Sequence, residues 1–199
     1  MDGGGCGCDR RARESRNLAL MVDQRECVAA LRAGTAAGGW TLDPQASSVQ
    51  FAVKHFWGSV TVLDQFERVA GEGSVTESGI LTGTLSVDAT SLTTKNKQRD
   101  KHLRSADFFD IEHHPMVVLT VTEAKPVDGG ALLCKGTLEA AGHLEPIEFT
   151  ANPQDFTDRA VTMTADLVVD RVRFGMTWSP MRIAAYDAHV TVTARFVRA

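Results

Sequence analysis

The chain has 199 residues, of which 43% are hydrophobic, and a formal net charge of -4. A chain of this length can bury a sizeable core. Its acidic balance argues against a nucleic-acid partner, because a phosphate-binding surface needs clustered Lys and Arg. The apolar runs are much shorter than the ~20 residues that a bilayer-spanning helix needs. We therefore expect a globular protein that neither binds nucleic acid nor spans a membrane.

Residues 1–39 differ in composition from the rest of the chain, because glycine-rich ends bracket an Arg-rich piece. The apolar stretch at residues 18–22 is too short for the hydrophobic region of a signal peptide, about 7 to 15 residues, so we expect a cytoplasmic protein. Residues 22–32 could form one amphipathic helix, but isolated helices shorter than ~12 residues are marginal in water. We predict a poorly ordered extension over 1–39, followed by one domain over 40–199.

The four cysteines form no recognisable disulfide framework. Cys6 and Cys8 lie in the extension, Cys27 lies in the possible helix, and Cys134 falls on the apolar face of a predicted strand. The Cys-x-Cys pair has no second Cys or His pair nearby, which argues against structural zinc. Free thiols in a reducing cytoplasm are the favoured interpretation. Translation from Met21 is an open alternative, and it would remove the first two cysteines.

From Trp40 onward, apolar and polar residues alternate with period two, a pattern typical of half-buried β-strands. No convincing crossover helix separates the strands, so we expect antiparallel pairing. Roughly eight such strands in ~160 residues can close into an up-and-down barrel, although composition alone also allows a sandwich. The clearest strand patterns lie at residues 49–55, 81–89, 132–138, 161–167 and 190–196. Two further strands are expected at residues 116–122 and 147–151.

Small residues fall in phase with the apolar face of these strands: Gly83, Gly136, Ala89, Ala140 and Ala165. They leave volume that a tightly packed sandwich would fill, which favours an eight-stranded barrel with room for one slender ligand. The other inward residues are Val, Leu, Phe and Met, so the ligand should be apolar and elongated. Replacing Gly136 with Phe should then block ligand uptake without unfolding the protein.

A long loop at residues 93–115 separates two predicted strands and suggests the mouth of the barrel. Four polar residues precede two aromatic ones in it: Arg99, Asp100, His102 and Arg104, then Phe108 and Phe109. Guanidinium groups suit diphosphate oxygens, because they donate in a fixed fork. An internal ion pair between Arg99 and Asp100 that pins the loop is the competing interpretation. We expect a structural role for Asp100 and possible head-group contacts from Arg99 and His102.

Sequence motifs in a fixed order support the barrel. They comprise Trp40-Thr-Leu-Asp-Pro44 with Ser48 to His55, then Thr93, Arg99-Asp100, His102-Leu103, Asp107-Phe108-Phe109 and Pro115, then Gly136-Thr-Leu138 and Asp170 to Met176. Together they resemble the YceI-like family of lipocalin-like polyisoprenoid-binding proteins, with a departure at residues 141–147 that affects one hairpin. The resemblance implies an all-β, single antiparallel up-and-down, lipocalin-like barrel with a short helix or loop at its mouth. It also implies a polyisoprenoid ligand and a homodimer, with no cofactor.

The candidate ligand contacts fall into two groups. For the apolar tail we expect contacts from Phe51, Val53, Phe56, Trp57, Leu85, Val87, Phe108 and Leu138. For the polar head we expect contacts from His55, Arg99, His102 and Arg171. His55 continues the apolar phase of its strand, and a polar ring at the end of an apolar wall can receive a head group. The competing interpretations are core packing for the apolar residues, a structural histidine at the rim, and a salt bridge for Arg171.

Two other classes of function stay open alternatives. A metal-dependent enzyme could use the loop at 99–114, which carries His102, His113 and His114 with three carboxylates, but adjacent histidines on an extended chain point to opposite sides. An interaction or stress-response protein with a packed barrel is the other alternative. We predict a protein that is not an enzyme and holds no metal, and that binds, transports or stores an amphipathic polyisoprenoid such as an isoprenoid quinone or polyprenyl phosphate.

Overall fold

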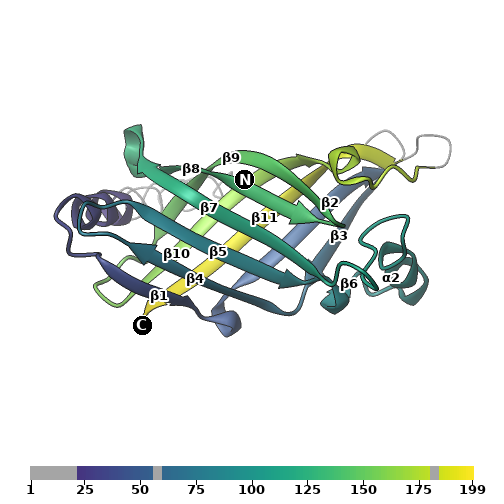
Figure 1. The fold of residues 1–199 in the computed structure, drawn as a ribbon, viewed down its shortest axis with the longest axis horizontal. Helices are drawn as coiled ribbons and strands as arrows, with labels where there is room; N and C mark the ends of the chain where they lie inside the picture. Colours follow the sequence, from purple (N-terminus) through teal and green to yellow (C-terminus); the bar gives the residue numbers. More distant parts are fainter. Residues whose placement is uncertain (1–21, 56–59, 180–183) are drawn as a thin grey trace, which may run out of the picture.

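Half-buried strands with alternating residues close into an antiparallel barrel, so the predicted fold class is confirmed (Figure 1). The structure, a computed structural model, describes residues 22–55, 60–179 and 184–199. Strand β11 pairs with β10 on one side and with β1 and β2 on the other, which closes the sheet. The strands are β1 (Gly38–Leu42), β2 (Ser48–His55), β3 (Val60–Phe66), β4 (Val69–Val75), β5 (Leu81–Asp88), β6 (Leu92–Thr93), β7 (Met116–Pro126), β8 (Leu132–Ala140), β9 (His143–Gln154), β10 (Ala160–Asp170) and β11 (Ala184–Arg198).

Three of the barrel strands are interrupted, so the eleven segments make eight strands around the barrel. The short 3-10 helix η1 (Pro44–Ala46) separates β1 from β2, and both segments pair with β11. Residues 67–68 separate β4 from β3, and η3 (Ala89–Ser91) separates β5 from β6. Each interruption bends its strand without ending its place in the sheet.

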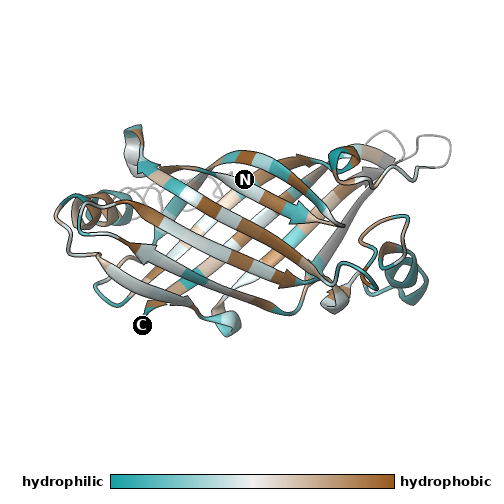
Figure 2. Cartoon of the chain, in the orientation of Figure 1, coloured by the Kyte–Doolittle hydropathy of each residue, from teal (hydrophilic) through white to brown (hydrophobic). Residues whose placement is uncertain are grey.

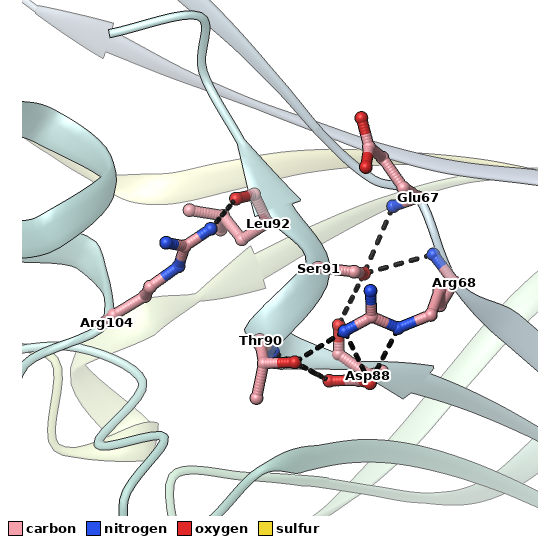
Figure 3. Close-up of polar contacts among 7 residues, drawn as sticks. All are labelled: Glu67, Arg68, Asp88, Thr90, Ser91, Leu92 and Arg104. Atoms are coloured by element: carbon pink, nitrogen blue, oxygen red, sulfur yellow. Dashed lines mark hydrogen bonds and ion pairs between the residues drawn. The ribbon is translucent and has the colours of Figure 1, made fainter. Parts of the chain in front are cut away.

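Serine hydroxyl groups replace the missing ladder bonds at these interruptions. Ser47 Oγ donates to the Asp43 carbonyl at 2.6 Å and accepts from the Arg195 N–H of β11 at 3.0 Å. Ser91 Oγ donates to the Asp88 carbonyl at 2.6 Å and accepts the backbone N–H groups of residues 67 and 68 at 3.1 and 3.0 Å (Figure 3). Unpaired backbone groups are costly inside a fold, so these hydroxyls stabilise the bends.

The two ends of the barrel carry different structures (Figure 1). At one end, called the mouth, lie α2 (Lys97–Leu103), the loop that follows it and η5 (Arg171–Phe174). At the opposite, distal end lie a helix of residues 22–32 and the turn that contains η4 (Asp128–Gly130). Figure 2 shows brown and paler residues alternating along the strands, while α2 is mostly hydrophilic. The barrel is therefore apolar along one face of each strand and polar around the mouth helix.

The N-terminal extension is more ordered than its sequence suggests. We expected poor order through residue 39, with one marginal helix possible at residues 22–32. That helix is present, and its Cys27, Val28 and Leu31 are buried in the barrel core. Tertiary packing on an apolar face stabilises a helix that would be marginal alone. Residues 1–21, with Cys6 and Cys8, lie outside the described part of the chain.

Strands β9 and β10 separate towards the mouth. Among the described residues, β9 pairs with β8 along residues 143–151 but with β10 only at residues 151–154. The space beside the mouth half of β9 is approached by η5, where Arg173 pairs with Glu145 of β9. The hairpin at 141–142, which departs from the family pattern, places Ala141 and Gly142 at positive φ of 49° and 77°.

Gly136 serves the strand pairing rather than the interior volume, which corrects the expectation drawn from its phase. A Cβ built on Gly136 would lie 1.8 Å from the Thr120 carbonyl oxygen of β7, next to an irregularity in the pairing of β7 with β8. Replacing Gly136 with Phe would therefore disrupt the sheet, and it does not test ligand uptake. Gly83, Ala140 and Ala165 do line internal cavities.

No helix in the part of the chain that the structure describes is long and apolar enough to cross a membrane.

Candidate functional site

The interior of the barrel contains two apolar cavities, one behind the other. The mouth-side cavity has a volume of about 130 Å³, and the distal cavity also has a volume of about 130 Å³. Both are bounded by Leu85, Leu119, Leu167 and Val192, so these four residues form a waist between them. The interior is therefore an elongated apolar space that side chains do not fill completely.

Four of the eight predicted tail contacts lie on the wall of the mouth-side cavity. Phe51, Leu85, Val87 and Leu138 line it, as the inward phase of their strands requires. Val53 is half-buried and packs against the same group of core residues. Phe56 and Trp57 lie outside the described residues.

Phe109 turns into the barrel, whereas the sequence analysis expected a tail contact from Phe108. Phe109 lines the mouth-side cavity, where its ring lies 6.0 Å from Phe51 and 5.7 Å from Phe66, both in edge-on geometry. Phe108 instead packs at the rim, 5.1 Å from the ring of His102 and 5.8 Å from that of Trp178. The loop is not a strand, so alternation along it gives no rule for which aromatic ring turns inward.

Among the described residues that line the mouth-side cavity, Arg171 is the one that carries a charge, and only 5% of it is exposed. Its Nε donates to the Ala185 carbonyl at 2.9 Å, and its Nη1 donates to the carbonyls of Met176 and, at 3.1 Å, Trp178. Its Nη2 is buried and has no hydrogen-bond partner among the described residues. A buried donor without a partner is costly, so this nitrogen is suited to a ligand oxygen.

Aromatic rings surround the Arg171 guanidinium. Its central carbon lies 5.9 Å from the ring centre of Phe108 and 5.7 Å from that of Tyr186. Burial lowers the pKa of Arg171 from its ordinary value, and the nearby Tyr186 and Asp170 oppose this shift. An arginine side chain offers only donors, so the group at this position must be an acceptor or an anion.

His102 belongs to the rim of the mouth. Its Nε2 lies 3.1 Å from Asp107 Oδ2, and its ring meets Trp178 edge-on at 4.3 Å. Trp178 is 43% exposed, so the ring cluster is open to solvent on one side. The structure brings His102, Phe108 and Arg171 to one cluster through Trp178 and the cation–π contact of Arg171 with Phe108.

The remaining polar residues of α2 and its C-cap Arg104 hold the loop in place. Asp100 Oδ1 accepts the N–H of Thr94 at 2.8 Å and its hydroxyl at 2.6 Å, while Arg99 Nη2 donates to the Thr94 carbonyl at 2.9 Å. Arg104 Nη2 donates to the Leu92 carbonyl of β6 at 2.6 Å (Figure 3). Arg99 lines a shallow outer groove of α2 rather than the cavity wall. The predicted structural position of Asp100 matches these contacts.

His55 ends β2, where its backbone pairs with Val60 and Ala184. This places residue 55 at the mouth end of the barrel, but its side chain lies outside the described part. The expected contact between His55 and a head group stays a prediction.

The adjacent histidines of the loop contact different groups. His113 Nδ1 lies 3.0 Å from Asp110 Oδ2, a hydrogen bond that raises the pKa of this exposed histidine. His114 lies against Gly142, since a Cβ on that glycine would be 2.6 Å from the imidazole. Among the residues that the structure describes, no three His, Cys, Asp or Glu side chains are grouped to hold a metal ion.

The sequence of this chain matches one family model and is similar to known bacterial proteins. The family model described as the YceI-like domain matches residues 40–197. A UPF0312 protein of Staphylococcus aureus (strain USA300) is 34% identical over 149 residues, which cover 70% of this chain and 83% of that protein.

Solved structures with the same fold are more distant in sequence. BcnA of Burkholderia cenocepacia has a TM-score of 0.70 at 15% identity, covering 77% of this chain and 98% of that one. A polyisoprenoid binding domain from Saccharophagus degradans, implicated in plant cell wall breakdown, has a TM-score of 0.66 at 16% identity, covering 80% of this chain and 98% of that one. From the match over residues 40–197 and the Staphylococcus aureus relative, the chain belongs to the family of the YceI-like domain.

Proposed function

We propose that this protein binds an amphipathic polyisoprenoid lipid and carries or stores it, without catalysing a reaction on it. The observation that carries the proposal is an apolar interior that ends at the buried Arg171, whose Nη2 has no partner among the described residues. An apolar tail and a polar head on one ligand match these two features. The described polyisoprenoid binding of the Saccharophagus degradans domain supports the same assignment at the level of the fold.

The tail contributes most of the affinity. Each buried methylene contributes about 0.8 kcal/mol, so a tail of several isoprene units needs no strong polar contact to bind. The waist of Leu85, Leu119, Leu167 and Val192 is formed by aliphatic side chains from four strands. Their rotamers can adjust to a slender chain that passes from the mouth-side cavity into the distal one.

The head group lies beside Arg171 in this account. A phosphate oxygen would accept a hydrogen bond from Nη2 and would also bring the opposite charge. A quinone carbonyl oxygen would accept a hydrogen bond from the same nitrogen without that opposite charge. The rings of Phe108 and Tyr186 flank the guanidinium and give the head an apolar surround. An isoprenoid quinone and a polyprenyl phosphate therefore both fit the proposal.

A titration with an apolar fluorescent probe tests the proposal. We expect one saturable site, from which a polyprenyl phosphate displaces the probe. Ala188 and His189 are neighbours on β11, but Ala188 lines the cavity and His189 is exposed. Ala188→Phe should therefore weaken probe binding at least about tenfold, by filling the space that the tail needs, while His189→Phe should leave it unchanged. Probe binding that does not saturate, or an equal effect of both variants, would contradict the proposal.

A further inference from the structure

The helix of residues 22–32 lies at the distal end of the barrel, outside the range that the YceI-like model matches (Figure 1). Cys27, Val28 and Leu31 share its inward face, with exposures of 5%, 8% and 3%. Residues three and four positions apart lie on the same side of a helix, and Val28 and Cys27 have these spacings from Leu31. The intervening Ala29 is exposed, so the helix has one face buried against the barrel and one face in contact with solvent.

Contacts with two distal turns and with β9 hold this helix across the end of the barrel. Asp23 Oδ2 accepts the backbone N–H of Asp155, in the turn between β9 and β10, at 3.0 Å. Gln24 Nε2 lies 3.4 Å from Asn152 Oδ1 of β9. The backbone of Gly79 approaches so closely that a Cβ there would be 2.5 Å from the Leu31 carbonyl oxygen. These contacts come from parts of the sheet that are far apart in sequence, so the helix spans the barrel end.

The segment that follows the helix is fixed as firmly. Trp40 Nε1 donates to the Ala36 carbonyl at 3.1 Å in a buried hydrogen bond. Arg198, near the end of β11, donates to the Thr35 carbonyl at 3.2 Å and places its guanidinium over the Trp40 ring at 5.5 Å. The helix and its connection to β1 are therefore both tied to the closing strands of the barrel.

This helix also forms part of the cavity wall. Cys27, Leu31 and Ala36 line the distal cavity together with Trp40. Burial raises the pKa of Cys27 to about 11, so the thiol is neutral at physiological pH and presents an apolar surface. A tail that passes the waist would meet this surface before it could leave the barrel.

We propose that the helix of residues 22–32 is the floor of the tail-binding space and sets the longest tail that the protein accepts, with Cys27 and Leu31 as the residues that determine this length. The inference rests on the proposed function, because it assumes a lipid tail in the barrel. The floor residues precede the matched domain, so tail length in this protein depends on a segment that the domain itself does not include.

Two phenylalanine substitutions in the full-length chain test the floor. Cys27→Phe places a ring in the distal cavity, and Ala29→Phe places the same ring on the exposed face of the same helix. Displacement of an apolar probe by farnesol, geranylgeraniol and solanesol measures affinity against tail length. Cys27→Phe should weaken the longest prenyl alcohol that the wild type binds by at least about tenfold and spare the shortest, while Ala29→Phe should match the wild type.

A substitution in the opposite direction covers the case in which Cys27→Phe unfolds the helix. Leu31→Ala deepens the distal cavity and should improve the binding of the longest alcohols severalfold, with circular dichroism and thermal melting reporting whether each variant keeps the fold. If the wild type binds prenyl alcohols but neither Cys27→Phe nor Leu31→Ala changes the dependence on length, the floor is wrong and the proposed function stands. If the wild type binds none of the three alcohols, the proposed function itself fails.

Discussion

Arg171 shows how a charged residue can be kept inside an apolar barrel. A buried guanidinium is costly unless acceptors surround it, and three backbone carbonyls supply them here. All three carbonyls belong to residues after η5, so the arginine also links η5 to the residues that follow it and to the start of β11. The nitrogen without a partner among the described residues makes the same side chain a candidate ligand contact.

Replacing Arg171 should separate these two roles. Arg171→Leu removes the donor to the head group and should weaken a polyprenyl phosphate by about 1.5 to 3 kcal/mol, but it should leave a prenyl hydrocarbon nearly unchanged. It should also lower the free energy of unfolding by about 1 to 3 kcal/mol, because buried carbonyls lose their donor. Arg171→Lys, which keeps the charge, is the control. Equal losses for the phosphate and the hydrocarbon would show that Arg171 does not contact the head.

Asp88 should make stability depend on pH at the acid end. The pKa of the Asp88 carboxyl is lowered from its ordinary 3.8, and the largest cause is the hydrogen bond that the Thr90 hydroxyl donates to it at 2.6 Å (Figure 3). The Arg68 side chain and the Thr90 N–H lower this pKa further, whereas burial of the carboxyl raises it. A lowered folded-state pKa contributes stability that is present above the unfolded-state pKa and is lost as the pH falls through the folded value.

We therefore expect Asp88→Asn to lower the free energy of unfolding by about 1 kcal/mol at neutral pH, since the 3-10 helix η3 loses its charged cap. Below about pH 4 the difference between the variant and the wild type should shrink, because the wild-type carboxyl becomes protonated. Urea unfolding at neutral and acid pH measures both values. A difference that is independent of pH would mean that the charge of Asp88 has no stabilising role.

At the scale of elements, the interruptions in the strands depend on a few hydroxyl groups. Ser91 is 5% exposed and makes three hydrogen bonds to the backbone around two neighbouring bends. Ser91→Ala should lower the free energy of unfolding by about 1 to 3 kcal/mol. Ser78→Ala, at an exposed turn, should cost less than about 0.5 kcal/mol. Similar midpoints of urea unfolding for both variants would contradict a special role for Ser91.

The pairing of β7 with β8 depends on the absence of a side chain at residue 136. Gly136→Ala would place a Cβ at 1.8 Å from the Thr120 carbonyl, so the two strands would have to separate and the free energy of unfolding should fall by at least about 1 to 3 kcal/mol. Gly39→Ala is the matched control, because its Cβ would meet only Ala199 at an ordinary 3.6 Å. If thermal melting shows the same small change for both, the close approach at Gly136 is not important.

The strands could be predicted from sequence because alternation is a local signal, and residues 132–138 and 161–167 lie within β8 and β10. The helix at 22–32 was anticipated from its amphipathic pattern, but its stability could not be predicted, since that comes from contacts with distant turns such as that of Asp155. The sequence also could not predict that Phe109 rather than Phe108 turns inward, because the loop has no regular period that distinguishes the two. Elements that local patterning specifies were predictable, and those that tertiary contacts specify were not.

At the scale of the whole molecule, the barrel joins an apolar interior to two unlike ends. The mouth carries Arg171 and the rings around it, and the distal end carries the helix with Cys27 and Leu31. The spacing of strands along the chain allowed either a barrel or a sandwich, and the small inward residues together with the family resemblance favoured the closed barrel. The separation of β9 from β10 could not be predicted, because it depends on how η5 packs beside β9, as in the pair of Arg173 with Glu145.

Organic extraction of the natively purified protein, followed by mass spectrometry of the extract, shows directly whether the barrel holds a prenyl lipid. We predict a single prenyl lipid with a polar head, present at about one molecule per chain, since a barrel of this size has room for one small ligand. Protein that carries no prenyl lipid, or that carries a molecule of another class in that amount, would contradict the account.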